Sequence, residues 1–179
     1  MSSFGVAKDR QVEIIDEFLA ANRLEKAADY LVELVGAWNI KHKYLTEEGH
    51  VSRILNDILG KEPALGIETA ERVLKAIPVR GRGETLNVLL NWAETNAGKN
   101  QLLASRALLA AAKYSGEDTE LREKAVRQYV ASASRLKEID AGLAFEAASS
   151  ALTFSQKDET LMQSVATELR ALNIPGLNI

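Results

Sequence analysis

The sequence predicts an all-α protein: a right-handed stack of antiparallel helical hairpins, with about nine helices in a single domain over residues 1–179. Three observations support this prediction. Val and Ile recur at the spacing of a helix face and hardly ever alternate as they would in a half-buried strand. Only 3 Pro interrupt the 179 residues. One stretch of the chain also occurs twice at an offset of 40 residues, which is typical of stacked helical hairpins.

The repeated stretch covers residues 114–121 and again residues 154–161. Each copy has an aromatic residue, a Ser, an Asp three positions after the Ser, and a Leu that opens an apolar stripe. We interpret Ser115 and Ser155 as N-caps of the helices that follow, because a Ser oxygen there accepts a first-turn amide and contributes about 1 kcal/mol. A pair of functional sites is the alternative. Capping is preferred because it explains the spacing, the repetition and the apolar run together.

The composition is that of an ordinary globular protein. Hydrophobic residues make up 46% and charged residues 26% of the chain, which disfavours wholesale disorder. Without Cys, the chain has no disulfide framework, thiolate metal site or Cys nucleophile. Its apolar runs are shorter than the roughly 18 residues of a membrane span, and its start lacks the apolar segment of a signal peptide. We therefore expect a cytoplasmic protein that does not contact a membrane.

The first hairpin is predicted over residues 8–38. Its first helix has an apolar stripe that includes Val12 and Leu19, spaced as one face of a helix. Asn22 opens a segment like a capping box, with Glu25 three residues later. This pattern favours a new helix over a continuation of the first.

The second hairpin is predicted over residues 46–77. Thr46 is the expected cap of its first helix. Gly60 and Pro63 separate its two helices, because Gly favours a helix end and Pro a first turn. Pro78 stops the second helix.

The third hairpin is predicted over residues 84–114, after a loop at residues 79–83. Asn96 and Gly98 break the hairpin between its helices. Residues 99–113 are apolar nearly all round, as expected of a helix packed between neighbours.

The fourth hairpin is predicted over residues 117–153, with a boundary near residues 137–140 that contains neither Gly nor Pro. Its second helix is rich in Ala, which lets neighbouring helices approach closely. The amphipathic helix over residues 156–172 suits the capping end of a stack. Because Pro175 cannot continue that helix, the apolar tail at residues 173–179 is expected to fold back or to dock onto another copy of the chain.

Ala141, Phe145 and Ala148 have a small-aromatic-small spacing that resembles the second helix of tetratricopeptide-like repeats, a class of α-solenoid. The Trp, Leu-Gly and Tyr signature of that family is missing from the preceding helix, and Thr153 stands where the family has a closing Pro. The resemblance implies a stack of hairpins with a concave face for partners. It implies no ligand residues.

The first candidate for partner binding is a basic-aromatic stretch. The net charge is −3, but residues 41–83 contain more basic than acidic side chains. Trp38, Lys41, Lys43 and Tyr44 mix cations with flat aromatic faces, which suit nucleobases, phosphates or an acidic peptide. Alternatively, the aromatic side chains close the hairpin and the Lys side chains are solvated.

The second candidate comprises Arg72, Lys75, Arg80 and Arg82. The last two lie in a loop with Gly residues, whose backbone amides can turn toward an anion. Arg also presents a planar fork of donors that matches a carboxylate or phosphate. The alternative is an ordinary loop in which Glu84 or another acidic residue pairs with the Arg side chains.

We expect no catalytic residues, no metal and no cofactor. His42 and His50 lie eight positions apart, and His42 precedes the helix expected from Thr46. The two imidazoles therefore do not converge on one helix face, as metal ligands would. The chain also lacks a Gly-rich phosphate loop.

These patterns favour a non-enzymatic adaptor that binds a partner protein or peptide in a groove formed by the first helices of successive hairpins. The alternative is a nucleic-acid-associated regulatory or scaffold protein that uses the basic stretches 38–44 and 72–82. Salt separates the two hypotheses, because phosphate contacts weaken steeply with ionic strength. Self-association through the C-terminal tail is a further expectation.

Overall fold

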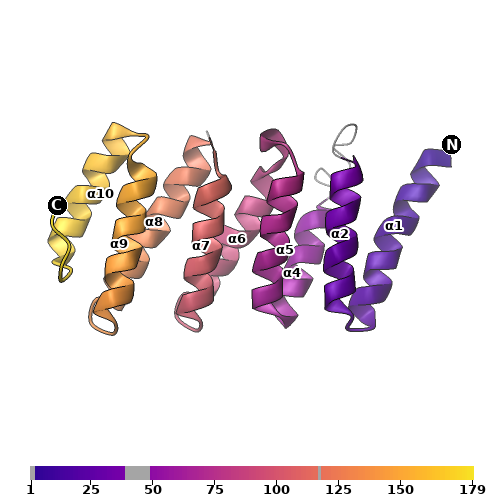
Figure 1. The fold of residues 1–179 in the computed structure, drawn as a ribbon, viewed down its shortest axis with the longest axis horizontal. Coiled ribbons are helices and arrows are strands. Elements are labelled where there is room, and N and C mark those ends of the chain that lie inside the picture. The colour runs from indigo at the N-terminus through magenta and orange to yellow at the C-terminus, as the bar shows by residue number, and fades with distance from the viewer. Residues whose placement is uncertain (1–2, 39–48, 117) are drawn as a thin grey trace. The chain divides into compact units, whose positions relative to one another are not determined.

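The computed structural model describes residues 3–38, 49–116 and 118–179, with the side chains of residues 3–9 and of Trp38 outside this description. Every regular element in these residues is helical, which confirms the all-α class. The α-helices of this part of the chain and the 3-10 turn η1 are α1 (Ser3–Ala20), α2 (Leu24–Trp38), α4 (His50–Lys61), α5 (Pro63–Ala76), η1 (Val79–Gly81), α6 (Gly83–Asn96), α7 (Gln101–Tyr114), α8 (Thr119–Leu136), α9 (Ala141–Ser155) and α10 (Glu159–Leu172) (Figure 1).

The chain forms two compact units, Met1–Val88 (unit 1) and Leu89–Ile179 (unit 2). α6 contributes its first residues to unit 1 and the remainder to unit 2. No helix in the described part of the chain is long and apolar enough to cross a membrane.

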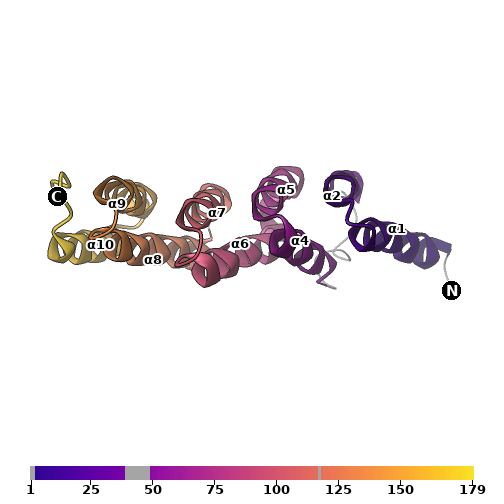
Figure 2. The ribbon, with the colours of Figure 1, turned by 90° about the horizontal axis from the view of Figure 1, so that it is seen from below.

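In unit 1, α2 and α5 form one layer and α1 and α4 form the other (Figure 2). α4 packs against α5, α5 packs against α2, and α1 contacts both α2 and α4. The core is aliphatic because the apolar stripes of these helices face one another. The largest fully buried side chains of unit 1 are Ile15, Leu31, Ile54, Leu55, Ile58, Leu59, Ile67, Leu74 and, at the start of α6, Leu86.

Gly66 permits the close approach of α5 to α4. A Cβ atom on Gly66 would lie 2.6 Å from Leu59 Cγ and 2.8 Å from Leu59 Cα. A larger residue would therefore push on the α4 backbone itself. As predicted, Pro63 occupies the start of α5, where its missing N–H costs no helical hydrogen bond.

α1 ends in a Schellman motif around Asn22, which has a φ of 54°. The Asn22 amide donates to Leu19 O at 3.2 Å. The Arg23 amide donates to Phe18 O at 2.8 Å, which completes the motif. The predicted capping box is therefore wrong: Asn22 closes α1, and α2 begins at Leu24. Thr46, the other cap predicted in this unit, lies outside the described residues.

The 40-residue repeat appears in unit 2 as equivalent ends of α7–α8 and α9–α10. Asp118 and Asp158 are the N-caps of α8 and α10, and their carboxylates accept from the amides of Leu121 at 3.0 Å and Leu161 at 2.9 Å. Both Leu side chains are buried, as predicted. Asp140 caps α9 in the same way, which explains how the chain turns there without Gly or Pro.

The predicted capping role of Ser115 and Ser155 is wrong. Both are buried, and their hydroxyls donate at 2.9 Å to Ala112 O and Leu152 O in the helix that each Ser follows or ends. The Ser residues thus close α7 and α9, whereas the Asp three positions later opens the next helix. The negative charge of this Asp also interacts favourably with the positive N-terminal end of the helix dipole.

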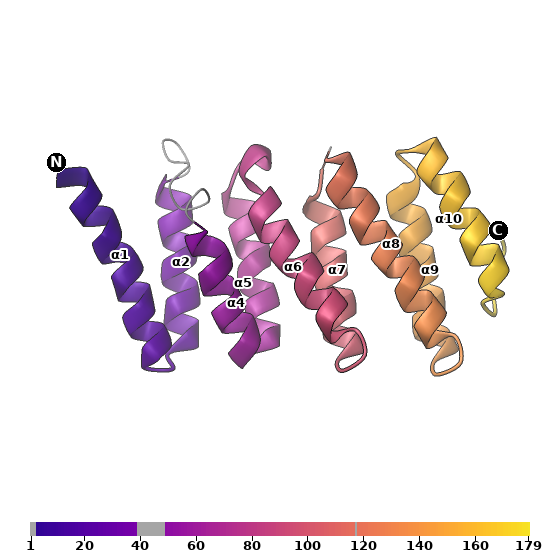
Figure 3. The same cartoon turned by 180° about the vertical axis from the view of Figure 1, so that it is seen from behind.

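In unit 2, α7 and α9 form one layer, and α8 and α10 form the other (Figures 2 and 3). α8 contacts α7, α9 and α10. The buried face of α9 consists largely of small side chains, as the sequence predicts for a close approach of helices. These residues are Ala144, Ala147, Ala148 and Ala151.

The C-terminal tail folds back onto unit 2, which confirms one of the two outcomes expected for it. Asn173 adopts a left-handed conformation after α10, and Ile174 is only 4% exposed. Arg170 Nε donates to the main-chain oxygen of Ile179 at 3.0 Å. Gly176 lies beside the Phe145 ring, so a Cβ atom there would be 3.8 Å from Phe145 Cδ2.

Candidate functional site

The first basic stretch lies mostly outside the described residues. Trp38 ends α2, but its side chain is not described, and neither are Lys41, Lys43 and Tyr44. The proposed role of these residues in binding therefore stays a prediction. The described residues resume at Gly49, the N-cap of α4.

Arg72 of the second stretch forms an ion pair within unit 1. Its Nη2 atom on α5 lies 2.7 Å from Asp29 Oδ1 on α2. Both side chains remain partly exposed, so the pair contributes little to stability. It does compete with any anion of a partner. Lys75, one turn further along α5, is exposed and forms no ion pair with a described residue.

The loop with Arg80 and Arg82 is an ordered turn. The Gly81 amide donates to Pro78 O at 2.9 Å, and the Arg82 amide donates to Val79 O at 3.2 Å. These two amides are therefore already used within η1 and are not available to an anion, whereas the binding role predicted for the loop stays a prediction. Arg80 projects from this turn as an exposed side chain, and Arg82 is half-buried.

Glu84, which follows the loop, contacts α4. Glu84 Oε1 accepts from the Ser52 amide at 3.3 Å and from the Ser52 hydroxyl. Ser52 lies in the first turn of α4, so the carboxylate of α6 caps a helix 32 residues earlier in the chain. The same oxygen would lie 3.9 Å from a Cβ atom on Gly49, the N-cap of α4.

Two features of the described residues bear on metal binding and on ionisable groups. No three His, Asp or Glu side chains within them are close enough together to hold a metal ion. Burial strongly raises the pKa of the Tyr129 phenol on α8, while Ser150 opposes the shift. The Tyr129 ring stacks on Phe154 at 6.2 Å between centroids, which is a core position and not a site open to a substrate.

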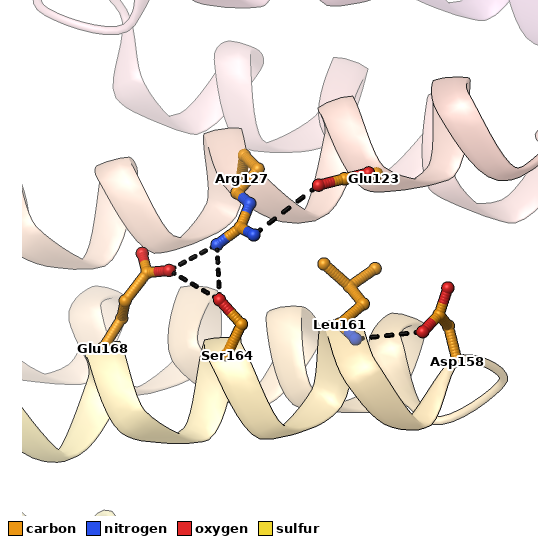
Figure 4. A network of polar contacts seen from close by, with 6 residues as sticks. All are labelled: Glu123, Arg127, Asp158, Leu161, Ser164 and Glu168. Atoms are coloured by element: carbon orange, nitrogen blue, oxygen red, sulfur yellow. Dashed lines mark hydrogen bonds and ion pairs between the residues drawn. The ribbon is translucent and has the colours of Figure 1, made fainter.

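A polar network joins α8 to α10 (Figure 4). The guanidinium of Arg127 lies 3.5 Å from Glu123 Oε1 and donates to Ser164 Oγ at 3.1 Å and to Glu168 Oε1. The Ser164 hydroxyl donates to the same Glu168 oxygen at 3.1 Å. Each charge in the network already has a partner from the chain, so we assign it a structural role.

α7 presents a stripe of apolar and basic side chains that the sequence analysis missed. Leu102 is 64% exposed and Leu109 is 48% exposed, although residues 99–113 were expected to be buried all round. Arg106 and Lys113 are exposed too, and the spacing puts all four on one helix face. Neither cation forms an ion pair with a described residue, and we call the four residues the α7 stripe.

A second exposed feature is an open hollow of about 520 Å³ on α10. It lies where α9, α10 and the tail meet. Its lining residues are Leu152, Met162, Gln163, Ala166, Thr167, Arg170 and Ile179. A comparison of the two repeat copies could have found it, because Met162 and Leu152 replace Arg122 and Ala112 of the first copy.

Comparison of the chain with protein-family models, with curated proteins and with solved structures found no match. The resemblance to tetratricopeptide-like repeats therefore stays a prediction.

Proposed function

We propose that the chain is a non-enzymatic interaction module, an adaptor or scaffold whose α7 stripe binds a segment of a partner protein. The observation that carries the proposal is the exposure of Leu102 and Leu109 on the face that also bears Arg106 and Lys113. Exposure of two Leu side chains to water is unfavourable, and a partner that covers them would gain the free energy of burying this apolar surface.

The chemistry of the stripe favours an acidic amphipathic helix as the partner segment. Leu102 and Leu109 are seven positions apart, a separation at which anchors recur on one face in helix-to-helix recognition. Arg106 lies between them and Lys113 follows them, so a partner with carboxylates beside its apolar anchors would match the stripe. The opposite face of α7 is anchored by Ala104, Ala107, Leu108 and Ala111, which gives the stripe a rigid support.

This proposal changes the surface expected from the sequence. A right-handed stack of antiparallel hairpins remains the architecture that we propose for the scaffold. The expected groove, however, was assigned to the first helices of the hairpins, such as α8 and α10. In unit 2, the exposed Leu side chains lie instead on α7, a second helix in that scheme.

The test uses designed acidic amphipathic peptides labelled with a fluorophore, with anisotropy measured against the full chain. Replacing both Leu102 and Leu109 by Ser should weaken binding at least about tenfold, equivalent to about 1.4 kcal/mol. Ile139→Ser is the matched control, because Ile139 is exposed but lies outside the stripe. If no peptide binds, or the double variant binds as well as the wild type, the proposal is wrong.

A nucleic-acid-associated role is the second candidate, and it rests on the exposed Lys75 and Arg80. Two observations count against this role: Arg72 is already paired with Asp29, and the amides of Gly81 and Arg82 already donate hydrogen bonds within η1. Replacing Lys75 and Arg80 by Gln should reduce binding of a single-stranded oligonucleotide and make its salt dependence shallower. Equal binding by the variant and the wild type at every salt concentration would remove these residues from the functional account.

A further inference from the structure

Some positions of the repeat in unit 2 have a buried side chain in the first copy but a half-buried or exposed one in the second copy. Leu121 and Leu161, like most core positions of the repeat, are buried in both copies. Several positions are buried in the first copy alone, and four of them are Ala112, Arg122, Val126 and Val130. Their equivalents 40 residues later are half-buried or exposed, namely Leu152, Met162, Ala166 and Arg170.

These four equivalents all line the hollow on α10. In the first copy, α9 covers α7 and α8, and α10 also packs on α8. The hollow is therefore the surface that another layer of helix covers one repeat earlier. Ile179 of the tail reaches one side of it.

Two of the four equivalents are more apolar or larger than their counterparts in the first copy. Ala112 of the first copy corresponds to the larger Leu152, and the charged Arg122 corresponds to the apolar Met162. Both changes increase the apolar area that association would remove from water. Ala166, one helical turn after Met162, leaves room for the backbone of an incoming helix to approach.

The charges on α10 indicate that the incoming helix is α10 of a second copy of the chain. Glu159 lies in the first turn and Arg170 in the last turn of α10, and both are exposed. The spacing from Glu159 through Met162 and Ala166 to Arg170 keeps these residues on one helix face. If two α10 helices pack antiparallel about a two-fold axis, each Glu159 faces the Arg170 of the other copy, and the helix dipoles also oppose each other.

We propose that two copies of the chain associate through this face of α10, with Met162 and Ala166 at the centre and a Glu159–Arg170 pair at each end. The contact is isologous, so it closes as a dimer and does not propagate. It uses a different face from the α7 stripe, so self-association and peptide binding can be tested separately.

Sedimentation equilibrium of the full chain is the first test. We expect a dimer at the upper end of a range from about 1 to 100 µM. Met162→Glu should raise the dissociation constant at least about tenfold, and circular dichroism should show that the variant remains folded. Leu109→Glu is the matched control, because Leu109 is at least as exposed but lies on the α7 stripe. The proposal would be overturned if the wild-type chain stayed monomeric. It would also be overturned if Met162→Glu did not weaken the dimer, or if Leu109→Glu weakened it as well.

A charge exchange tests the antiparallel arrangement. Arg170→Glu and Glu159→Lys should each weaken the dimer, and the double variant should restore most of the wild-type affinity because the pair is re-formed with reversed signs. Arg170 also holds the tail through Ile179, but loss of that contact alone would not be rescued by Glu159→Lys.

A cross-link gives an independent readout, since the natural chain has no Cys. In the proposed dimer, Ala166→Cys places two thiols near the two-fold axis, and mild oxidation should yield a covalent dimer. The same substitution at Leu109 should not. Failure of the double charge variant to recover affinity, or equal cross-linking at both positions, would contradict this arrangement.

Discussion

The carboxylate of Glu84, at the start of α6, caps the first turn of α4 through Ser52. Glu84 Oε1 accepts from the Ser52 amide at 3.3 Å and also from its hydroxyl. The N-cap of α4 is Gly49, which has no side chain for this task. Unit 1 thus obtains from a distant segment the capping group that the local sequence lacks.

Glu84→Ala should therefore destabilise unit 1 by about 1–2 kcal/mol, the usual range for loss of a cap. Glu84→Gln should cost less, because the amide oxygen can still accept the hydrogen bonds while the interaction of the charge with the helix dipole is lost. Urea denaturation followed by circular dichroism measures both effects. Glu68→Ala on α5 is the control, since Glu68 is exposed; an equal loss at the two positions would show that the cap contributes nothing.

Two glycines on neighbouring helices should respond in opposite directions to the same substitution. Gly66→Ala should destabilise the protein by about 1–3 kcal/mol, since the added methyl group would press on the side chain and backbone of Leu59. Gly60→Ala should stabilise it by about 0.5–1 kcal/mol, because nothing lies within 4 Å of a Cβ atom there and Ala is the better helix former. Thermal melting of the two variants tests the pair. A shift of the same sign in both would contradict the packing of α4 on α5.

The equivalence of Leu121 and Leu161 predicts similar costs for their truncation. Each is buried at the third position of a helix whose Asp cap holds its amide. Leu→Ala at either site should cost about 2–5 kcal/mol. Leu102→Ala provides the comparison, because Leu102 lies on an exposed face and should change the free energy of unfolding by less than about 1 kcal/mol. A small effect at either buried Leu would count against the repeat.

The buried Tyr129 predicts a loss of stability at alkaline pH. Burial raises the pKa of its phenol above the ordinary value of 10.0, so the folded state keeps the proton at a pH where the unfolded state releases it. This contribution is fully present below pH of about 10 and is lost as the pH rises above that value. Tyr129→Phe should make the alkaline decline shallower and should retain the stack on Phe154.

The measurement is the free energy of unfolding from pH 8 to pH of about 11 for wild type and variant. Tyr30→Phe is the control for removal of a hydroxyl from another aromatic pair, since Tyr30 packs edge-on against Phe18. If the Tyr129 variant declines as steeply as the wild type, the phenol does not govern this part of the pH profile.

The helical class and most helix boundaries were determined by the sequence itself, because both depend on neighbours a few positions away. Apolar residues at helical spacing marked α4, α5 and α10, and Pro63 marked the first turn of α5. The repeat was visible in the sequence as well, but the N-cap role was assigned to the wrong residue of each copy, to Ser in place of Asp. Ser and Asp are both good N-caps, and only the coordinates show that Asp118 opens α8 while Ser115 closes α7.

Only the tertiary structure decided which charged and apolar side chains are available. Arg72 pairs with Asp29 from 43 residues away, and this cannot be read from its own helix. The apolar α7 looked buried all round, yet Leu102 on one of its faces is exposed. Helix formation depends on hydrogen bonds between residues four apart, whereas exposure and ion pairing depend on which segments meet after the helices pack.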